Sequence, residues 1–244
     1  MTPRAPEYLV PVDVGQAADY TAMGGLRRVP KATGKTSEIY EGSSVSMKRE
    51  YEDQFHLGYA HRFPLHTPYP QIVDKLVTIQ ATIPGTSRFI FDATGVGRPV
   101  VDMAHEAGLN PIGVLITGGS GAAQQDATTG FWKVPKRELV SRTQSYMQSG
   151  KLFLSSKLPL CDVIVKELLA FKMKISTATG HMSFEAWRDS IHDDLVLMLC
   201  LGIWWGHMTR TGWQFDRGPH STHDEQQRAS ARKKYGTEKD DFGW

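Results

Sequence analysis

The chain has 244 residues and a mass of 27.2 kDa, which is enough for one large domain or two small ones. Apolar residues make up 40% of it and charged residues 22%, the composition of a soluble globular protein. Its net charge of +2 is too small to indicate nucleic-acid binding by itself, although a basic face could accompany an acidic site. The two cysteines lack metal-ligand spacing, the N-terminal residues lack the apolar core of a signal peptide, and the longest apolar stretch, 195–206, is shorter than the roughly 20 residues of a membrane span. We therefore expect a cytoplasmic protein without disulfides and without a membrane partner.

The first 63 residues predict four strands, because short apolar runs are separated by turn-forming Gly, Asp, Thr and Ser. These runs are 8–14, 21–29, 37–42 and 55–63. Pro11 is unusual within the first of them, since proline lacks the N–H that a strand ladder uses.

Strand and helix alternate in the next part of the chain. Apolar residues at helical spacing predict a helix over 72–83, which is followed by an apolar strand at 88–91. A helix over 98–108 and a buried strand over 110–117 come next. This alternation predicts a sheet with a parallel portion that is covered by helices.

The second half of the chain predicts further helices and a polar tail. In chain order we expect a helix within 134–150, a short strand or extended link at 151–155, a helix over 161–173, a hairpin around 174–187 and an apolar helix from Asp194. From about Trp213 the sequence is polar, mixed in charge and poor in aliphatic residues. We therefore expect residues 1–208 to form one folded domain and residues 209–244 to form a loosely ordered tail.

Acidic residues stand at the ends of buried segments. Asp13 follows the first apolar strand, Asp92 follows "FIF", and Asp193 and Asp194 directly precede the last apolar helix. Because the carboxyl ends of neighbouring parallel strands open on a common crevice, these carboxylates would converge if the strands at 8–14 and 88–91 were neighbours and the last helix packed with its N-terminus over that crevice. A divalent cation would offset their mutual repulsion, and oxygen ligands without a Cys or His cluster favour Mg²⁺ or Mn²⁺. Two such ions about 3.5–4 Å apart can drive phosphodiester hydrolysis.

Each acid also has a simpler interpretation. Asp13 and Asp92 could each start a turn, and "HDD" before a helix is what N-capping and the helix dipole favour without any chemistry. Asp19, across the "GQAA" loop from Asp13, could reach the same cleft or be a turn residue.

Basic residues and glycine-rich segments supply weaker signals. Lys136 and Arg137, with Lys133, precede the middle helix and could hold a DNA backbone, although an ordinary solvated surface is an equally simple interpretation. The segment "ATGKTS" has Val29 where a phosphate-binding loop needs Gly, and "GGSGAA" has Gln124 where a dinucleotide loop needs Gly or Ala. We therefore expect no nucleotide cofactor and no ATPase motif in this chain.

Four stretches, in their order and spacing, resemble the nuclease domain of the large terminase subunit of tailed bacteriophages. They are "DVGQAADYTA", "PLHTPYPQIV", "FDATGVGRPVVDMA" and "HDDLVLMLCLGIWW", and the segment from Gly130 to Leu154 is similar as well, so the resemblance covers most of residues 7–206. It implies an RNase H-like, resolvase-type α/β fold with a central mixed five-stranded sheet, three strands antiparallel and two parallel, flanked by helices. It also implies an endonuclease with two metal ions that cuts concatemeric double-stranded viral DNA during genome packaging.

The resemblance assigns roles by position. Asp13, Asp92 and Asp194 would be catalytic and would hold Mg²⁺ or Mn²⁺, with Asp193 and Asp19 serving the second ion or the water. A complete large terminase also carries an ATPase motor, so the resemblance implies that the motor is a separate chain or has been removed. Its implied partners are double-stranded DNA, a packaging ATPase, a small terminase subunit and a portal protein, in the cytoplasm of a bacterial host that carries the phage or prophage.

Two alternatives to this function remain open at this point. A Holliday-junction resolvase would use the same fold and the same acids on a branched substrate. A non-catalytic module that binds DNA or docks a packaging motor would use the acids only as caps.

Overall fold

The structure, a computed structural model, describes residues 6–15, 19–41, 44–119, 121–176 and 193–210. Its elements in chain order are β1 (Glu7–Asp13), β2 (Ala22–Glu41), β3 (Ser44–Arg62), α1 (Tyr69–Thr82), β4 (Ser87–Asp92), α2 (Gly97–Glu106), β5 (Pro111–Thr117), β6 (Gln124–Gln125), β7 (Trp132–Pro135), α3 (Lys136–Gln148), β8 (Leu152–Leu154), α4 (Cys161–Ser176) and α5 (Asp194–Arg210). None of the helices in these ranges is long and apolar enough to cross a membrane.

The strands form one mixed sheet in the order β6-β7-β5-β4-β1-β2-β3-β8. Its centre has three antiparallel strands, β3, β2 and β1, followed by two parallel ones, β4 and β5, which is the RNase H-like arrangement expected from the resemblance. The sheet has eight strands rather than the expected five. The three additional strands, β6, β7 and β8, have only two to four residues each. The sequence allowed for β8 as a short strand or link at 151–155, whereas β6 and β7 are too short for an alternating pattern to identify them.

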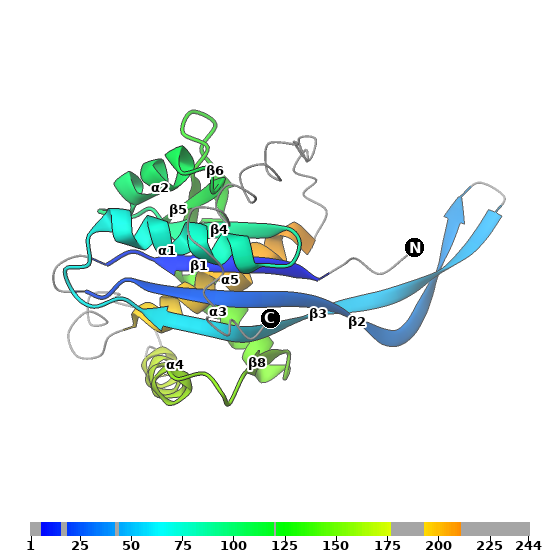
Figure 1. The fold of residues 1–244 in the computed structure, drawn as a ribbon. Coiled ribbons are helices and arrows are strands. Elements are labelled where there is room, and N and C mark those ends of the chain that lie inside the picture. The colour runs from blue at the N-terminus through cyan, green and yellow to red at the C-terminus, as the bar shows by residue number, and fades with distance from the viewer. Residues whose placement is uncertain (1–5, 16–18, 42–43, 120, 177–192, 211–244) are drawn as a thin grey trace.

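Helices cover both faces of the sheet (Figure 1). On one face, α1 and α2 pack over one apolar cluster, to which β1 contributes Val10 and Val12. On the other face, α3, α4 and α5 share a second cluster, to which β1 contributes Leu9. Successive strand side chains alternate between faces, so the odd positions of β1, including Asp13, point toward α5.

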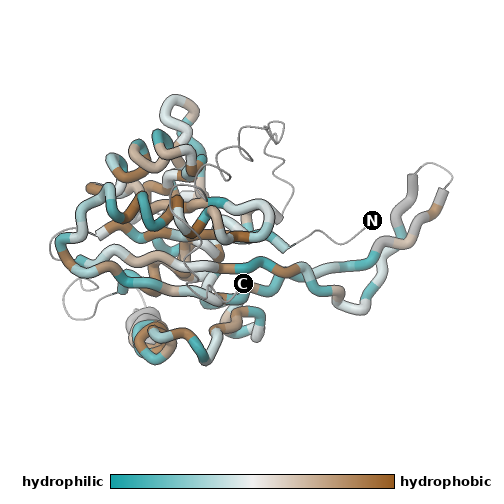
Figure 2. The backbone as a smooth tube through the Cα atoms, viewed as in Figure 1, coloured by the Kyte–Doolittle hydropathy of each residue, from teal (hydrophilic) through white to brown (hydrophobic). Residues whose placement is uncertain are grey.

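Strands β2 and β3 extend beyond the body as a long hairpin arm, defined here as residues 31–52 (Figure 1). Figure 2 shows that the arm is mainly pale or hydrophilic, whereas the same strands carry more hydrophobic residues where they cross the body. The sequence predicted separate strands at 21–29 and 37–42, and this is wrong. The turn-forming residues around Gly34, which has a φ of +80°, make a bulge inside one continuous strand because β3 pairs with β2 on both sides of it.

Other expectations differ less from the structure. Pro11 lies within β1 beside Ile90 of the parallel strand β4, so the missing N–H does not end the strand. Helix α4 continues to Ser176, which makes the first three residues of the hairpin expected at 174–187 helical. The rest of that hairpin, and the expected tail from residue 211 onward, lie outside the described residues.

Candidate active site

Asp13 and Asp92 lie side by side at the carboxyl ends of two neighbouring parallel strands. The pairing of β1 with β4 runs in register up to Val12 and Phe91, so the next residue on each strand is an aspartate. Both are 9% exposed, and the charge of Asp92 raises the pKa of Asp13. The two residues on which the sequence argument depended are therefore neighbours, on the sheet face covered by α5.

The protein environment disfavours ionisation of both carboxyl groups. Burial is the largest cause that raises the pKa of Asp13 well above its usual value, and the charges of Asp92, Asp194 and Asp193 raise it further. Burial also raises the pKa of Asp92, although hydrogen bonds from Thr94 and the charge of Lys136 oppose this shift. Because two neighbouring carboxylates repel each other, ionisation of one disfavours ionisation of the other.

Local turn structure holds Asp92 in place. Its Oδ1 accepts a hydrogen bond of 2.7 Å from the backbone N–H of Thr94, and the hydroxyl of Thr94 accepts one of 2.9 Å from Ile116 in β5. Gly97 begins α2 so close to the end of β4 that a Cβ there would overlap the carbonyl oxygen of Asp92. The glycines after Asp92 thus allow α2 to start directly behind the carboxylate.

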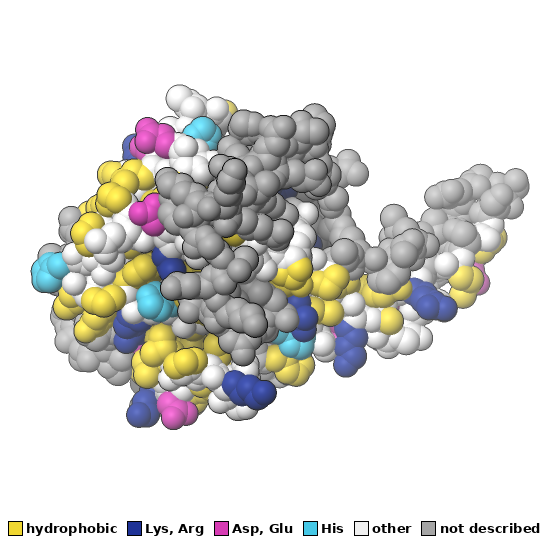
Figure 3. Space-filling view, in the orientation of Figure 1, with side chains coloured by type: hydrophobic (Ala, Val, Ile, Leu, Met, Phe, Trp, Pro, Cys, Tyr) yellow, Lys and Arg dark blue, Asp and Glu magenta, His cyan; other side chains and the backbone are white. Residues whose placement is uncertain are grey.

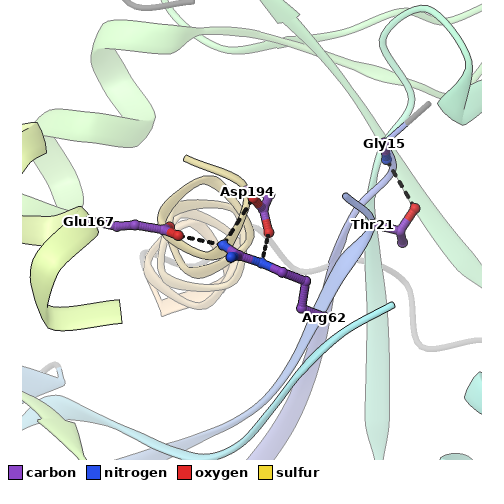
Figure 4. Close-up of polar contacts among 5 residues, drawn as sticks. All are labelled: Gly15, Thr21, Arg62, Glu167 and Asp194. Carbon is purple, nitrogen blue, oxygen red and sulfur yellow. Dashed lines mark hydrogen bonds and ion pairs between the residues drawn. The ribbon is translucent and has the colours of Figure 1, made fainter. Parts of the chain in front are cut away.

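The N-terminus of α5 brings Asp194 and Asp193 to the same region, and each of them has a basic partner. Figure 4 shows the partner of Asp194. Arg62, the last residue of β3, donates from Nε to Asp194 Oδ2 at 2.7 Å and from Nη2 to Asp194 Oδ1 at 3.0 Å. Asp193 Oδ2 lies 3.9 Å from Lys136 Nζ. The negative charges of Asp193 and Asp194 both raise the pKa of Asp13. The final acids thus lie within electrostatic range of the Asp13–Asp92 pair.

Glu167 of α4 is an acid of this region that the sequence reasoning missed. It is 5% exposed and accepts a hydrogen bond from Arg62 Nη2. Burial raises its pKa to about 7, an effect that the charge of Asp194 increases and the contact with Arg62 opposes. Its position between Ile164 and Leu168 places it on a helix face that is otherwise apolar, and this pattern could have indicated a buried acid.

Asp19 is exposed, unlike the buried acids, and lines an open hollow of about 280 Å³. The hollow is lined by the loop after β1 and by the segment that leads into α1: Gly15, Asp19, Thr21, Pro64, His66, Thr67, Pro68 and Tyr69. Gly15 and Thr21, which face each other across this loop in Figure 4, are joined by a hydrogen bond of 3.1 Å from the Gly15 backbone N–H.

The three basic residues that precede α3 have different surroundings. Lys136 lies beside the acids, where its charge lowers the pKa of both Asp13 and Asp92. Arg137 is exposed, and Lys133 forms an ion pair of 2.9 Å with Asp126 in the turn between β6 and β7. On the face shown in Figure 3, the Lys and Arg side chains of the described residues are scattered rather than gathered in one patch.

The residues present fit a divalent cation at the Asp13–Asp92 pair. Two neighbouring buried carboxyl groups offer oxygen ligands whose mutual repulsion a hard cation would relieve. Within the described part of the chain, no three His, Cys, Asp or Glu side chains are placed to hold an ion together as they stand. Both carboxylate oxygens of Asp194 instead accept hydrogen bonds from Arg62.

Comparison with known proteins finds similarity at the level of structure. No family model matches the chain, and no curated protein matches its sequence. Among solved structures, the large terminase nuclease from the thermophilic phage G20c, with bound zinc, is 15% identical with a TM-score of 0.44, covering 81% of this chain and 80% of that one. The terminase nuclease domain of human cytomegalovirus, soaked with manganese, is 13% identical with a TM-score of 0.41, covering 80% of each chain. Both are nuclease domains of terminases, the family that the sequence motifs resemble.

Proposed function

We propose that the protein is a metal-dependent endonuclease that hydrolyses phosphodiester bonds of double-stranded DNA during the packaging of concatemeric viral genomes. The observation that carries this proposal is the pair of buried carboxyl groups, Asp13 and Asp92, at the ends of two neighbouring parallel strands, with the charge of Asp194 near them. Burying several acids together is costly unless a cation joins them, so such clusters are found where a metal is used.

The acidic residues would bind the metal ions, and the basic residues would bind the DNA. Asp13, Asp92 and Asp194 would hold Mg²⁺ or Mn²⁺, with Asp193 near enough to contribute to a second ion. When bound, the ions would supply an activated water and stabilise the negative charge that develops on the phosphate. Lys136, at the edge of the acids, would contact the phosphate backbone and align the strand, with Arg137 as an outer contact.

Nicking of supercoiled plasmid tests the catalytic part of the proposal. With Mn²⁺ or Mg²⁺ the unaltered protein should cut the plasmid. Asp92→Asn should reduce the cleavage rate roughly 100-fold or more, because losing one electrostatic contact to a transition state lowers the rate by about this factor. Asp102→Asn, on the exposed side of α2, is the matched control and should leave the rate unchanged. Equal cutting by the Asp92 variant would contradict the proposal.

The choice of substrate separates the remaining alternatives. Preferential cutting of a four-way junction over linear duplex would assign the protein to the resolvases, whereas cutting of linear duplex supports the packaging role. A protein that binds duplex DNA but cuts neither substrate with any divalent metal would be a docking module. The packaging ATPase, small subunit and portal protein stay predicted partners.

A further inference from the structure

Three charged side chains from three elements form a buried chain at the start of α5. Glu167 of α4 accepts from Arg62 of β3, and Arg62 donates to Asp194, the first residue of α5 (Figure 4). Their side chains are only 5%, 18% and 7% exposed, respectively. Solvent screening is therefore weak, and the geometry of the three groups is set by the protein.

The contact between Arg62 and Asp194 fixes the orientation of the carboxylate. Nε and Nη2 of the guanidinium each hold one carboxylate oxygen, at 2.7 and 3.0 Å, which defines the plane of the group as well as its position. Each carboxylate oxygen has a second lone pair, so this contact leaves Asp194 able to bind a cation. The contact therefore fixes the orientation of Asp194 while its oxygens can still bind a cation.

Arg62 is itself fixed on several sides. Glu167 shares its Nη2, and the ring of Tyr20 lies 5.2 Å from its guanidinium carbon. Its backbone is paired with Ala22 of β2, which in turn is paired with Asp13. The guanidinium thus has a defined position relative to the strand that carries Asp13, although α5 comes from a distant part of the sequence.

We propose that Arg62 and Glu167 are positioning residues that hold Asp194 in the orientation needed to share a divalent cation with Asp13 and Asp92. This inference rests on the proposed function. Glu167 acts through Arg62, and Arg62 acts through Asp194, so neither touches the reacting atoms. The two-point contact is the essential feature, and a lysine, which keeps the charge but has a single ammonium group, cannot reproduce it.

Titration of the metal-free full chain with Mn²⁺, followed by calorimetry or by the EPR signal of free Mn²⁺, tests this role. Arg62→Lys and Arg62→Gln should both weaken Mn²⁺ binding about 10-fold or more, the scale seen when partners of metal ligands are removed. Glu167→Gln should weaken it by a smaller factor, because Arg62 and Asp194 remain. Arg49→Lys and Glu106→Gln, two exposed residues far from these contacts, are the controls. Melting curves in EDTA verify that each variant is folded.

The outcomes distinguish this inference from the proposed function. Unchanged Mn²⁺ affinity in Arg62→Lys would show that only the charge matters, and tighter binding in Arg62→Gln would show that Arg62 competes with the cation; either result overturns the positioning role alone. If the unaltered protein binds no Mn²⁺ in a manner that depends on Asp13, the proposed function and this inference both fail. In cleavage assays, a fall in kcat without a change in KM for DNA would support positioning over a direct DNA contact.

Discussion

Asp13 occupies a position in which ionisation costs folding energy. Burial and three neighbouring acids raise its pKa well above 3.8, so the folded protein binds this proton more tightly than the unfolded chain does. In the absence of metal, stability from this group is therefore lost as the pH rises from about the unfolded pKa through the raised folded pKa. Such a cost to stability is common where a side chain is kept for function.

Replacing Asp13 with Asn should stabilise the metal-free protein. Asn cannot ionise, so at pH 8 in EDTA we expect a gain of about 1–2 kcal/mol, the range of stabilising single substitutions, and a rise in Tm of roughly 2–8 °C. Near pH 4 the gain should shrink, because the native carboxyl group is then protonated. Melting curves at the two pH values measure the effect, with Asp102→Asn as control. A variant less stable than the native protein at pH 8 would contradict this account.

Helix α5 is the element that connects the sheet with the acids. It is apolar on nearly all sides because it lies between the sheet and α3, with α4 alongside, and Leu195, Leu199 and Trp204 are fully buried. Two glycines bring it close to the strands. A Cβ at Gly202 would lie 3.0 Å from Pro11 Cγ, and one at Gly206 would lie 2.5 Å from Phe55 Cε1. This close packing sets the height of Asp194 above the sheet.

Gly206→Ala should destabilise the protein although alanine favours helices. The added methyl group would meet Phe55, which is fully buried, and such overpacking costs about 1–3 kcal/mol against a helix-propensity gain of about 1 kcal/mol. We expect a net loss of about 1–2 kcal/mol in denaturant unfolding. Gly118→Ala, where a Cβ would meet no atom within 4 Å, is the matched control. Equal stability of the two variants would show that α5 can shift away from the sheet.

At the scale of the whole molecule, the hairpin arm stands outside the two apolar clusters. Among the side chains of 31–52 that the structure describes, none belongs to either cluster, and Val45 and Met47 near the end of the arm are 57% and 63% exposed. Where β2 and β3 cross the body, by contrast, Leu26 and Phe55 are fully buried. The body should therefore fold without the outer part of the arm.

Replacing residues 33–50 with Asn-Gly tests this independence, because Ala32 and Tyr51 are paired and a two-residue turn can join them. We expect one cooperative unfolding transition, with stability within about 1 kcal/mol of the native protein, since no buried cluster loses a side chain. Leu26→Ala, in the part of β2 that crosses the body, should instead cost about 2–5 kcal/mol. Aggregation or loss of cooperativity in the shortened protein would contradict the prediction.

Local patterns in the sequence were sufficient for much of the fold and for half of the site. The apolar strand before Asp92, the run before Asp13 and the apolar helix after Asp194 are short-range signals, and burial in the structure agrees with them. Neighbouring parallel strands then bring Asp13 and Asp92 together with no further information. The sequence did not predict the bulge at Gly34, because turn-forming residues do not indicate whether the strand pairing continues after them.

The partners of Asp194 were decided only by the tertiary structure. Arg62 is 132 residues away from Asp194 and 105 residues away from Glu167, and the three meet because β3, α4 and α5 pack at one end of the sheet. The sequence does not distinguish a charged residue that faces water from one that contacts a buried carboxylate. The sequence alone determined which residues are acidic and where strands and helices end, whereas packing decided which acid is held by which base, because burial and long-range contacts set the energy of a charge.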